Sequence, residues 1–130
     1  MKQVMVFGTF DFIHPGHLNF FKQAKKYGDK LTVVVARDTT AKKIKKKLPM
    51  NSEKDRQQLV AELKIVNQAV LGDKVDQMKV VRRLKPNVVC LGYDQKAFVN
   101  LLESDFPQIK LVRLKAYKSR FYKSSQLKKL

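Results

Sequence analysis

The sequence holds too few cysteine and histidine residues for several common kinds of site. One cysteine, Cys90, and two histidines occur among 130 residues. A single cysteine cannot form an internal disulfide, and its VVCLG surroundings favour a small buried hydrophobic side chain. Zinc needs three or four ligands, and only Asp11 and Asp38 could supplement the two imidazoles. The sequence therefore argues against both a disulfide framework and a zinc centre.

Long apolar runs are also missing. Hydrophobic residues make up 44% of the chain, but charges interrupt their runs well before the length that crosses a bilayer. The first residues, MKQVMVFG, resemble a strand and leave no room for the regions of a signal peptide. We expect a soluble, cytoplasmic protein with no membrane partner. Its length fits a single domain over residues 1–130 that buries a core without disulfides or a structural metal.

Acidic residues are scarce. The chain has 11 acidic and 28 basic residues, a formal net charge of +17, and such an excess attracts polyanions. Residues 39–51 carry five lysines and no acid, and residues 106–130 carry eight Lys and Arg and no acid. Two interpretations stay open. The runs are either a solvated basic face or two segments that converge on a phosphate-rich ligand.

Apolar runs alternate with segments of helical periodicity. The expected strands cover 3–8, 31–36, 68–72, 87–92 and 109–114. The expected helices run from Pro15 to before Gly28 and over 53–64, 75–85 and 95–104, with a last one beginning in SSQLKKL. Leu59, Val60 and Leu63 are expected to face inward from the 53–64 helix, and Val75 belongs to the apolar positions of the 75–85 helix. Residues 39–51 are predicted as a short helix or a mobile loop. Strands this apolar are covered on both faces, so the pattern predicts an α/β fold with one doubly wound parallel five-stranded sheet.

In such sheets ligands bind at the carboxyl ends of the strands, near the point where the strand order reverses. Three polar segments are expected at that edge: GTFD (8–11), ARD (36–38) and GYDQ (92–95). They should therefore face one crevice.

The stretch VMVFGTFDFIHPGH (4–17) contains both histidines. Gly8 after the first strand lets a phosphate approach the backbone, and the helix that starts at Pro15 offers free amides to an anion. His14 and His17, one helical turn apart, could donate hydrogen bonds to phosphate oxygens. The alternative is a surface pair without function. The chain has neither GxxxxGK[ST] nor GxGxxG, so a phosphate site here must be of another kind.

The segment GTFDFIHPGH (8–17) resembles the signature of the cytidylyltransferase-like nucleotidyltransferases. The resemblance extends to about residue 127 and implies a Rossmann-like nucleotidyltransferase fold. It also implies transfer of a nucleotidyl group from a nucleoside triphosphate to a phosphate acceptor, with release of pyrophosphate. The nucleotide-binding residues expected on this basis are Gly8, Thr9, Phe10, His14, His17, Gly92, Asp94, Ser124 and Ser125.

By the same resemblance, His14 and His17 would be catalytic, together with Lys42 and Lys45 from a mobile clamp of lysines. Magnesium or another divalent cation would bridge the triphosphate oxygens, with Asp11 as a contact. The residues expected to bind the acceptor are Asp11, Asp38, Arg56, Lys118 and Arg120. For Arg56 the alternative is an ordinary surface charge on a helix.

Two further segments distinguish members of the family. Glycerol-3-phosphate cytidylyltransferases, which use CTP, carry GDDW and RTEGIST where this chain has LGYDQ (91–95) and YKSRFYKSSQL (117–127). With VARD (35–38) and KSS (123–125), these segments look more like archaeal-type FAD synthases, which transfer AMP from ATP to FMN. Tyr117, Phe121 and Tyr122 would offer aromatic surface to the flavin, or would be plain core.

The FAD synthase interpretation is preferred, and a cytidylyltransferase acting on glycerol 3-phosphate or another small phosphorylated alcohol is the second. A third interpretation from another class, a nucleic-acid-binding domain, rests on the net charge alone and lacks a recognisable motif. Relatives are commonly dimers, and the apolar helix faces permit a homodimer.

Overall fold

The computed structural model describes residues 1–116. Its strands and helices, in chain order, are β1 (Gln3–Gly8), α1 (Pro15–Lys25), β2 (Lys30–Val35), α2 (Asp38–Lys45), α3 (Glu53–Ala61), β3 (Gln68–Leu71), α4 (Lys79–Leu84), β4 (Val88–Leu91), α5 (Val99–Asp105) and β5 (Lys110–Arg113). The predicted last helix lies outside the described residues. So do several predicted site residues: Tyr117, Lys118, Arg120, Phe121, Tyr122, Lys123, Ser124 and Ser125.

The five strands form one sheet in the order β3-β2-β1-β4-β5, and every neighbouring pair is parallel. This confirms the predicted α/β fold with a doubly wound parallel sheet. The chain winds outward from β1 through β2 to β3, then returns to β4 on the other side of β1. The strand order therefore reverses between β1 and β4, where such sheets bind ligands.

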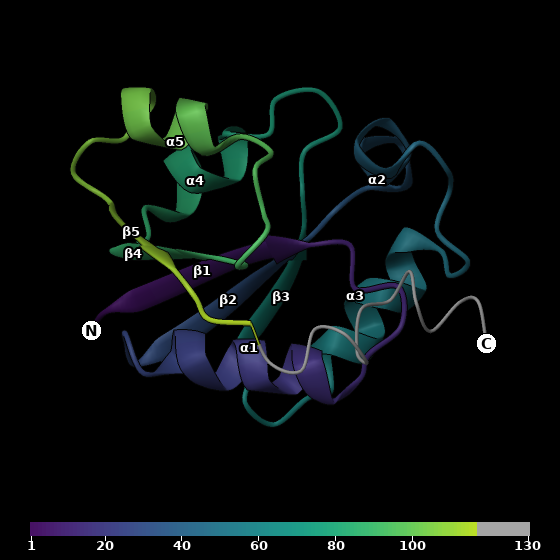
Figure 1. Cartoon of the computed structure of the whole chain (residues 1–130), viewed down its shortest axis with the longest axis horizontal. Helices are drawn as coiled ribbons and strands as arrows, with labels where there is room; N and C mark the ends of the chain where they lie inside the picture. The colour runs from purple at the N-terminus through teal and green to yellow at the C-terminus, as the bar shows by residue number, and fades with distance from the viewer. Residues whose placement is uncertain (117–130) are drawn as a thin grey trace.

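Helices cover both faces of the sheet (Figure 1). On one face α1 and α3 pack against the core side chains of β1 and β2, with Phe21, Ala24 and Val60 fully buried. On the other face α4 and α5 bury Val81 and Leu102 against the sheet. Since both faces of the central strands are covered, these strands are continuous apolar runs rather than alternating ones.

Two predicted details were wrong. The helix expected over 75–85 begins only at Lys79, because the Asp73 carboxylate accepts hydrogen bonds from the backbone N–H groups of Val75 and Asp76 and forms a turn there. Val75 is consequently 90% exposed rather than inward-facing. In α3 the expected core residue Leu59 is 52% exposed, because the helix turns Arg56 and Val60 toward the interior instead.

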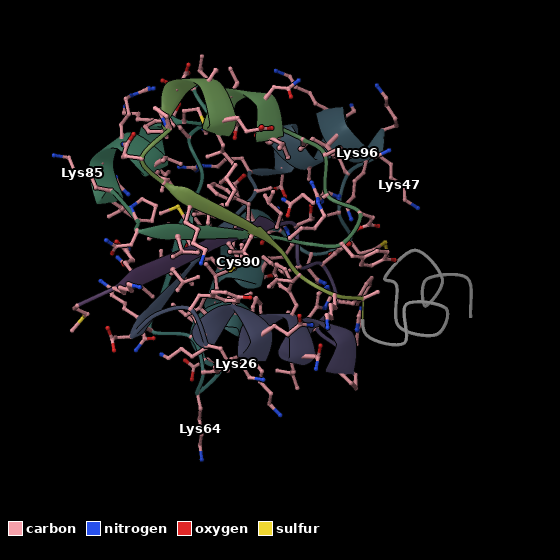
Figure 2. The ribbon with its side chains drawn as sticks, turned by 60° about the vertical axis from the view of Figure 1, so that its left-hand side comes forward. Lys26, Lys47, Lys64, Lys85, Cys90 and Lys96 are labelled. Atoms are coloured by element: carbon pink, nitrogen blue, oxygen red, sulfur yellow. The ribbon has the colours of Figure 1, made fainter. Side chains whose placement is uncertain are left out.

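The lysines labelled in Figure 2 extend outward from different sides of the molecule, whereas Cys90 lies within the sheet. Cys90 is fully buried on β4, as predicted, and burial raises the pKa of its thiol to about 12. A thiol that stays protonated is a poor nucleophile, so Cys90 contributes packing rather than chemistry.

Candidate active site

A cavity of about 560 Å³ opens at the carboxyl edge of the sheet. All three segments expected at this edge contribute to its lining, from residues 8–11, from Ala36 and from residues 92–95. The predicted site residues that line it are Gly8, Thr9, Phe10, Asp11, His14, His17, Lys45, Gly92 and Asp94. Lys42, Asp38 and Arg56 are not among its lining residues. Its volume is typical of cavities that bind small organic ligands.

The two histidines form the N-terminal cap of α1. The Gly16 N–H donates to Nδ1 of His14 at 3.1 Å, and the His14 N–H donates to Nδ1 of His17 at 3.3 Å. This is a reciprocal capping box in which imidazoles take the roles that serine and glutamate usually play. The rings stack with their centroids 3.9 Å apart. The cap therefore fixes the orientation of both rings.

The cap also determines where each imidazole carries its proton. Because Nδ1 accepts a hydrogen bond in both rings, the proton of each neutral ring sits on Nε2 and makes that atom a donor. Burial, the neighbouring His14 and Lys45 lower the pKa of His17 to about 3, against an opposing hydrogen bond to the Phe12 backbone. Burial lowers the pKa of His14 as well. In the absence of an anion both rings are therefore neutral donors at neutral pH.

The depressed pKa of His17 predicts an acid-sensitive fold. Between its unfolded pKa of 6.5 and its folded pKa of about 3, the unfolded chain binds a proton that the folded protein does not. Stability is therefore complete above pH 6.5 and falls as the pH drops, by up to about 1.4 kcal/mol per pH unit. The free energy of unfolding is measured in urea at pH 7 and at pH 5, without nucleotide. Between these two pH values it should fall by about 2 kcal/mol more in the wild type than in His17→Gln. Equal losses would contradict the buried, neutral state of His17.

The side chain of Phe10 packs against the ring of His17. Its backbone is left-handed, with φ of 54°, which is uncommon for a bulky residue. Its ring is only 6% exposed and meets the His17 ring edge to face, with centroids 5.5 Å apart. A Cβ on Gly8 would lie 2.5 Å from this ring, so the glycine makes room for it. Phe10 therefore lines the cavity and also helps to hold the His17 ring in position.

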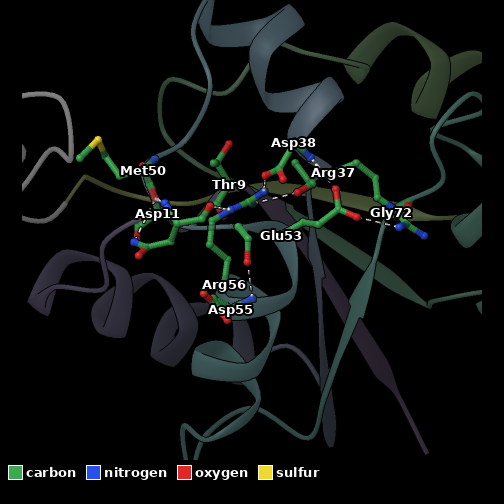
Figure 3. Close-up of polar contacts among 12 residues, drawn as sticks. Thr9, Asp11, Arg37, Asp38, Met50, Glu53, Asp55, Arg56 and Gly72 are labelled. Carbon is green, nitrogen blue, oxygen red and sulfur yellow. Dashed lines mark hydrogen bonds and ion pairs between the residues drawn. The ribbon is translucent and has the colours of Figure 1, made fainter.

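Arg56 lies at the centre of a buried polar network (Figure 3). Its side chain is fully buried, and its guanidinium donates to the backbone carbonyls of Thr9 and Ala36, each at 2.8 Å. It also donates to the Asn51 carbonyl at 3.0 Å and pairs with the Asp38 carboxylate at 2.7 Å. The surface interpretation disagrees with this geometry, and the predicted acceptor contact stays a prediction. Arg56 and Asp38 instead join the ends of β1 and β2 to the start of α3.

Asp11 anchors the loop between α2 and α3. Its carboxylate accepts hydrogen bonds from the N–H groups of Met50 and Asn51 at 2.8 and 2.9 Å, and from the Asn51 side chain at 3.1 Å. Asp11 is 4% exposed, and these three hydrogen bonds occupy most of the acceptor sites of its carboxylate. Within residues 1–116 no three His, Cys, Asp or Glu side chains gather closely enough to hold a metal. The predicted contacts of Asp11 with the acceptor and with a metal stay predictions.

The lysine-rich segment is helical in its first half. α2 ends where Lys46 takes a left-handed conformation, and Lys45 in its last turn reaches the cavity wall. Lys45 is also close enough to His17 to influence its pKa. Of the two lysines predicted to meet the phosphates, Lys45 is therefore the better placed.

Sequence reasoning missed the residues that brace the edges of the cavity. Arg37 donates to the Gly72 carbonyl at 2.7 Å and pairs with Glu53 at 2.9 Å, while Glu53 accepts from the Asp38 N–H at 2.8 Å (Figure 3). That backbone hydrogen bond and Arg37 lower the pKa of Glu53. The Gln77 amide, which also lines the cavity, donates to the Thr40 hydroxyl at 3.3 Å. Nothing in the local sequence marks these partners, because they are far apart along the chain.

Comparison with known proteins agrees with this fold. The model of the family described as cytidylyltransferase-like matches residues 5–129. The chain belongs to this family of nucleotidyltransferases. It is 42% identical over 133 residues to an FAD synthase of Thermoplasma volcanium, covering 99% of this chain and 93% of that protein. The resemblance to archaeal FAD synthases seen in the sequence is therefore confirmed.

Two solved structures extend the comparison. One, described as a lipopolysaccharide core biosynthesis protein from Thermoplasma volcanium, superposes with a TM-score of 0.84 at 43% identity, over 91% of this chain and 99% of that one. A pantoate-beta-alanine ligase from Francisella tularensis superposes with a TM-score of 0.65 at 19% identity, over 99% of this chain and 65% of that one. The second likeness shows the fold alone. None of the helices within the described residues has the length and apolar character of a membrane span.

Proposed function

We propose that this protein is an FAD synthase that transfers AMP from ATP to FMN, with release of pyrophosphate. The observation that carries the proposal is its 42% identity to a curated FAD synthase over nearly the full length of both chains. The cavity adds support, because its lining brings together the family signature, the two capped imidazoles and Lys45. The runner-up is transfer of CMP from CTP to glycerol 3-phosphate.

In the proposed reaction a phosphate oxygen of FMN attacks the α-phosphorus of ATP. A bond forms between these two atoms, and the bond from the α-phosphorus to the oxygen bridging to the β-phosphate breaks, so that pyrophosphate leaves with the electron pair. The FMN phosphate is already an anion and needs little base catalysis, so positioning and charge neutralisation supply most of the rate. The Nε2–H groups of His14 and His17 donate to phosphate oxygens as negative charge builds on them.

Lys45 and the N-terminus of α1 add positive potential to the lining of the cavity. Divalent cations are common in this family, and magnesium is the expected one. It would enter with the triphosphate and be bound mainly by phosphate oxygens, as magnesium usually is in nucleotide sites. A homodimer and a cytoplasmic location remain predictions.

A substrate grid tests the function. ATP and CTP are each combined with FMN and with glycerol 3-phosphate, and pyrophosphate release is followed with magnesium present. We expect release with ATP and FMN to exceed every other combination by at least about 10²-fold, since a site built for one base and one acceptor leaves polar groups unpaired with another. A maximum with CTP and glycerol 3-phosphate would establish the runner-up. Release in no combination would remove the enzymatic assignment.

A further inference from the structure

We propose that Arg113 is a positioning residue that holds the base-binding side of the cavity, and that through it β5 controls affinity for the nucleotide. The proposal rests on the proposed function for the identity of the nucleotide, and on the polar contacts of residues 92–95, here called the 92–95 turn, for the mechanism. Arg113 itself does not line the cavity.

The 92–95 turn begins where β4 ends. All four of its residues, Gly92, Tyr93, Asp94 and Gln95, line the cavity. The turn follows the strand next to β1, so it stands at the point where the strand order reverses. With Phe98 it supplies aromatic side chains and backbone polar groups, which suit a flat heteroaromatic base. The histidines on the opposite β1 side would then meet the phosphates.

The turn is closed on itself by two hydrogen bonds. The Gln95 N–H donates to the Gly92 carbonyl at 3.1 Å, and the Gly92 N–H donates to the Gln95 side-chain oxygen at 3.1 Å. The Gln95 amide nitrogen lies 3.4 Å from the Phe7 carbonyl at the end of β1, a long contact. These bonds shape the turn but fasten it only weakly to the sheet.

Arg113 adds a stronger attachment. It is the last residue of β5, paired in register with Leu91 of β4, so its side chain starts beside the residue that precedes the turn. Its Nη1 donates to the carbonyls of Gly92 and Gln95 at 2.8 and 2.7 Å. One charged nitrogen thus ties the first residue of the turn to its last. Charge-assisted bonds of this length are stronger than neutral ones.

Arg113 is exposed and forms no part of either apolar core, so its loss should loosen the turn without unfolding the sheet. Water replaces part of each bond at an exposed site, and the expected effect is therefore moderate. A loosened turn would cost affinity for the base but not for phosphate, because the phosphate-binding groups sit on α1 and α2.

The test is isothermal titration of Arg113→Met with ATP and, separately, with inorganic tripolyphosphate, both without FMN. We expect affinity for ATP to fall about tenfold and affinity for tripolyphosphate to stay within about twofold of the wild type. Arg113→Lys, which keeps a cationic donor able to bridge two carbonyls, should recover part of the loss. The matched control is Arg83→Met, which removes another exposed arginine, from the last turn of α4. It should leave both affinities unchanged.

Three results would overturn the proposal: unchanged ATP affinity in Arg113→Met, an equal loss for ATP and tripolyphosphate, or the same loss in Arg83→Met. The last two would indicate a general effect of removing positive charge. Because binding is measured without an acceptor, these results stand apart from the substrate grid. A different acceptor would change the proposed function and leave the role of Arg113 intact.

Discussion

His14→Asn and His17→Gln should each lower turnover by about 10²-fold or more while leaving the fold nearly as stable as the wild type. Each substitution keeps the helix-capping function of the histidine and removes its Nε2–H donor. Asparagine is a favoured N-cap residue, and glutamine at the third helical position completes a capping box, so the start of α1 retains its hydrogen bonds. What disappears is the Nε2–H group that we propose donates to the phosphates. The measurement is kcat together with the melting temperature.

Alanine variants at the same positions provide the comparison. They remove the cap as well as the donor, and the loss of an N-cap side chain costs about 1 kcal/mol. We therefore expect His14→Ala and His17→Ala to lose both turnover and stability. His14→Asn and His17→Gln should lose turnover alone. Turnover near the wild-type value in His14→Asn or His17→Gln would refute the proposed contact of that ring with the phosphates.

Arg56→Met should destabilise the protein by about 3 kcal/mol, because it removes every donor from a buried network and leaves its acceptors unsatisfied. The guanidinium donates hydrogen bonds to three carbonyls and to the Asp38 carboxylate. Because Asp38 is partly exposed, water can replace some of the hydrogen bonds that the substitution removes. The measurement is urea unfolding at pH 7. Turnover should fall too, since Thr9 and Asn51 would lose their common support beside the cavity.

Arg82→Met is the matched control. Arg82 also pairs with a carboxylate, Asp76, but both side chains are about half exposed. Exposed ion pairs contribute about 0–1 kcal/mol, so this variant should remain close to the wild type. If Arg56→Met cost no more than Arg82→Met, the buried network would be dispensable and the account of Arg56 wrong.

Asp11 and Arg56 show how much reasoning from single residues leaves out. A carboxylate beside a phosphate site suggests a metal ligand, and an arginine in the first turn of a helix suggests a solvated charge. Asp11 instead accepts three hydrogen bonds from residues 50 and 51, and Arg56 bonds a carbonyl 47 residues away at Thr9. Both side chains hold distant segments of the site together, and no pattern in the local sequence reveals these contacts.

The sequence by itself determined the strands, most of the helices, the parallel sheet and the position of the two histidines at a helix start. These follow from hydrophobic runs, from helical periodicity and from the spacing of a short motif, all of which act between near neighbours along the chain. Only the tertiary structure decided the burial of Arg56, the anchoring by Asp11 and the reach of Arg113 to Gly92 and Gln95. Each of these depends on which carbonyl, carboxylate or N–H group a distant segment brings within about 3 Å, and that is settled only when the strands align and the helices pack.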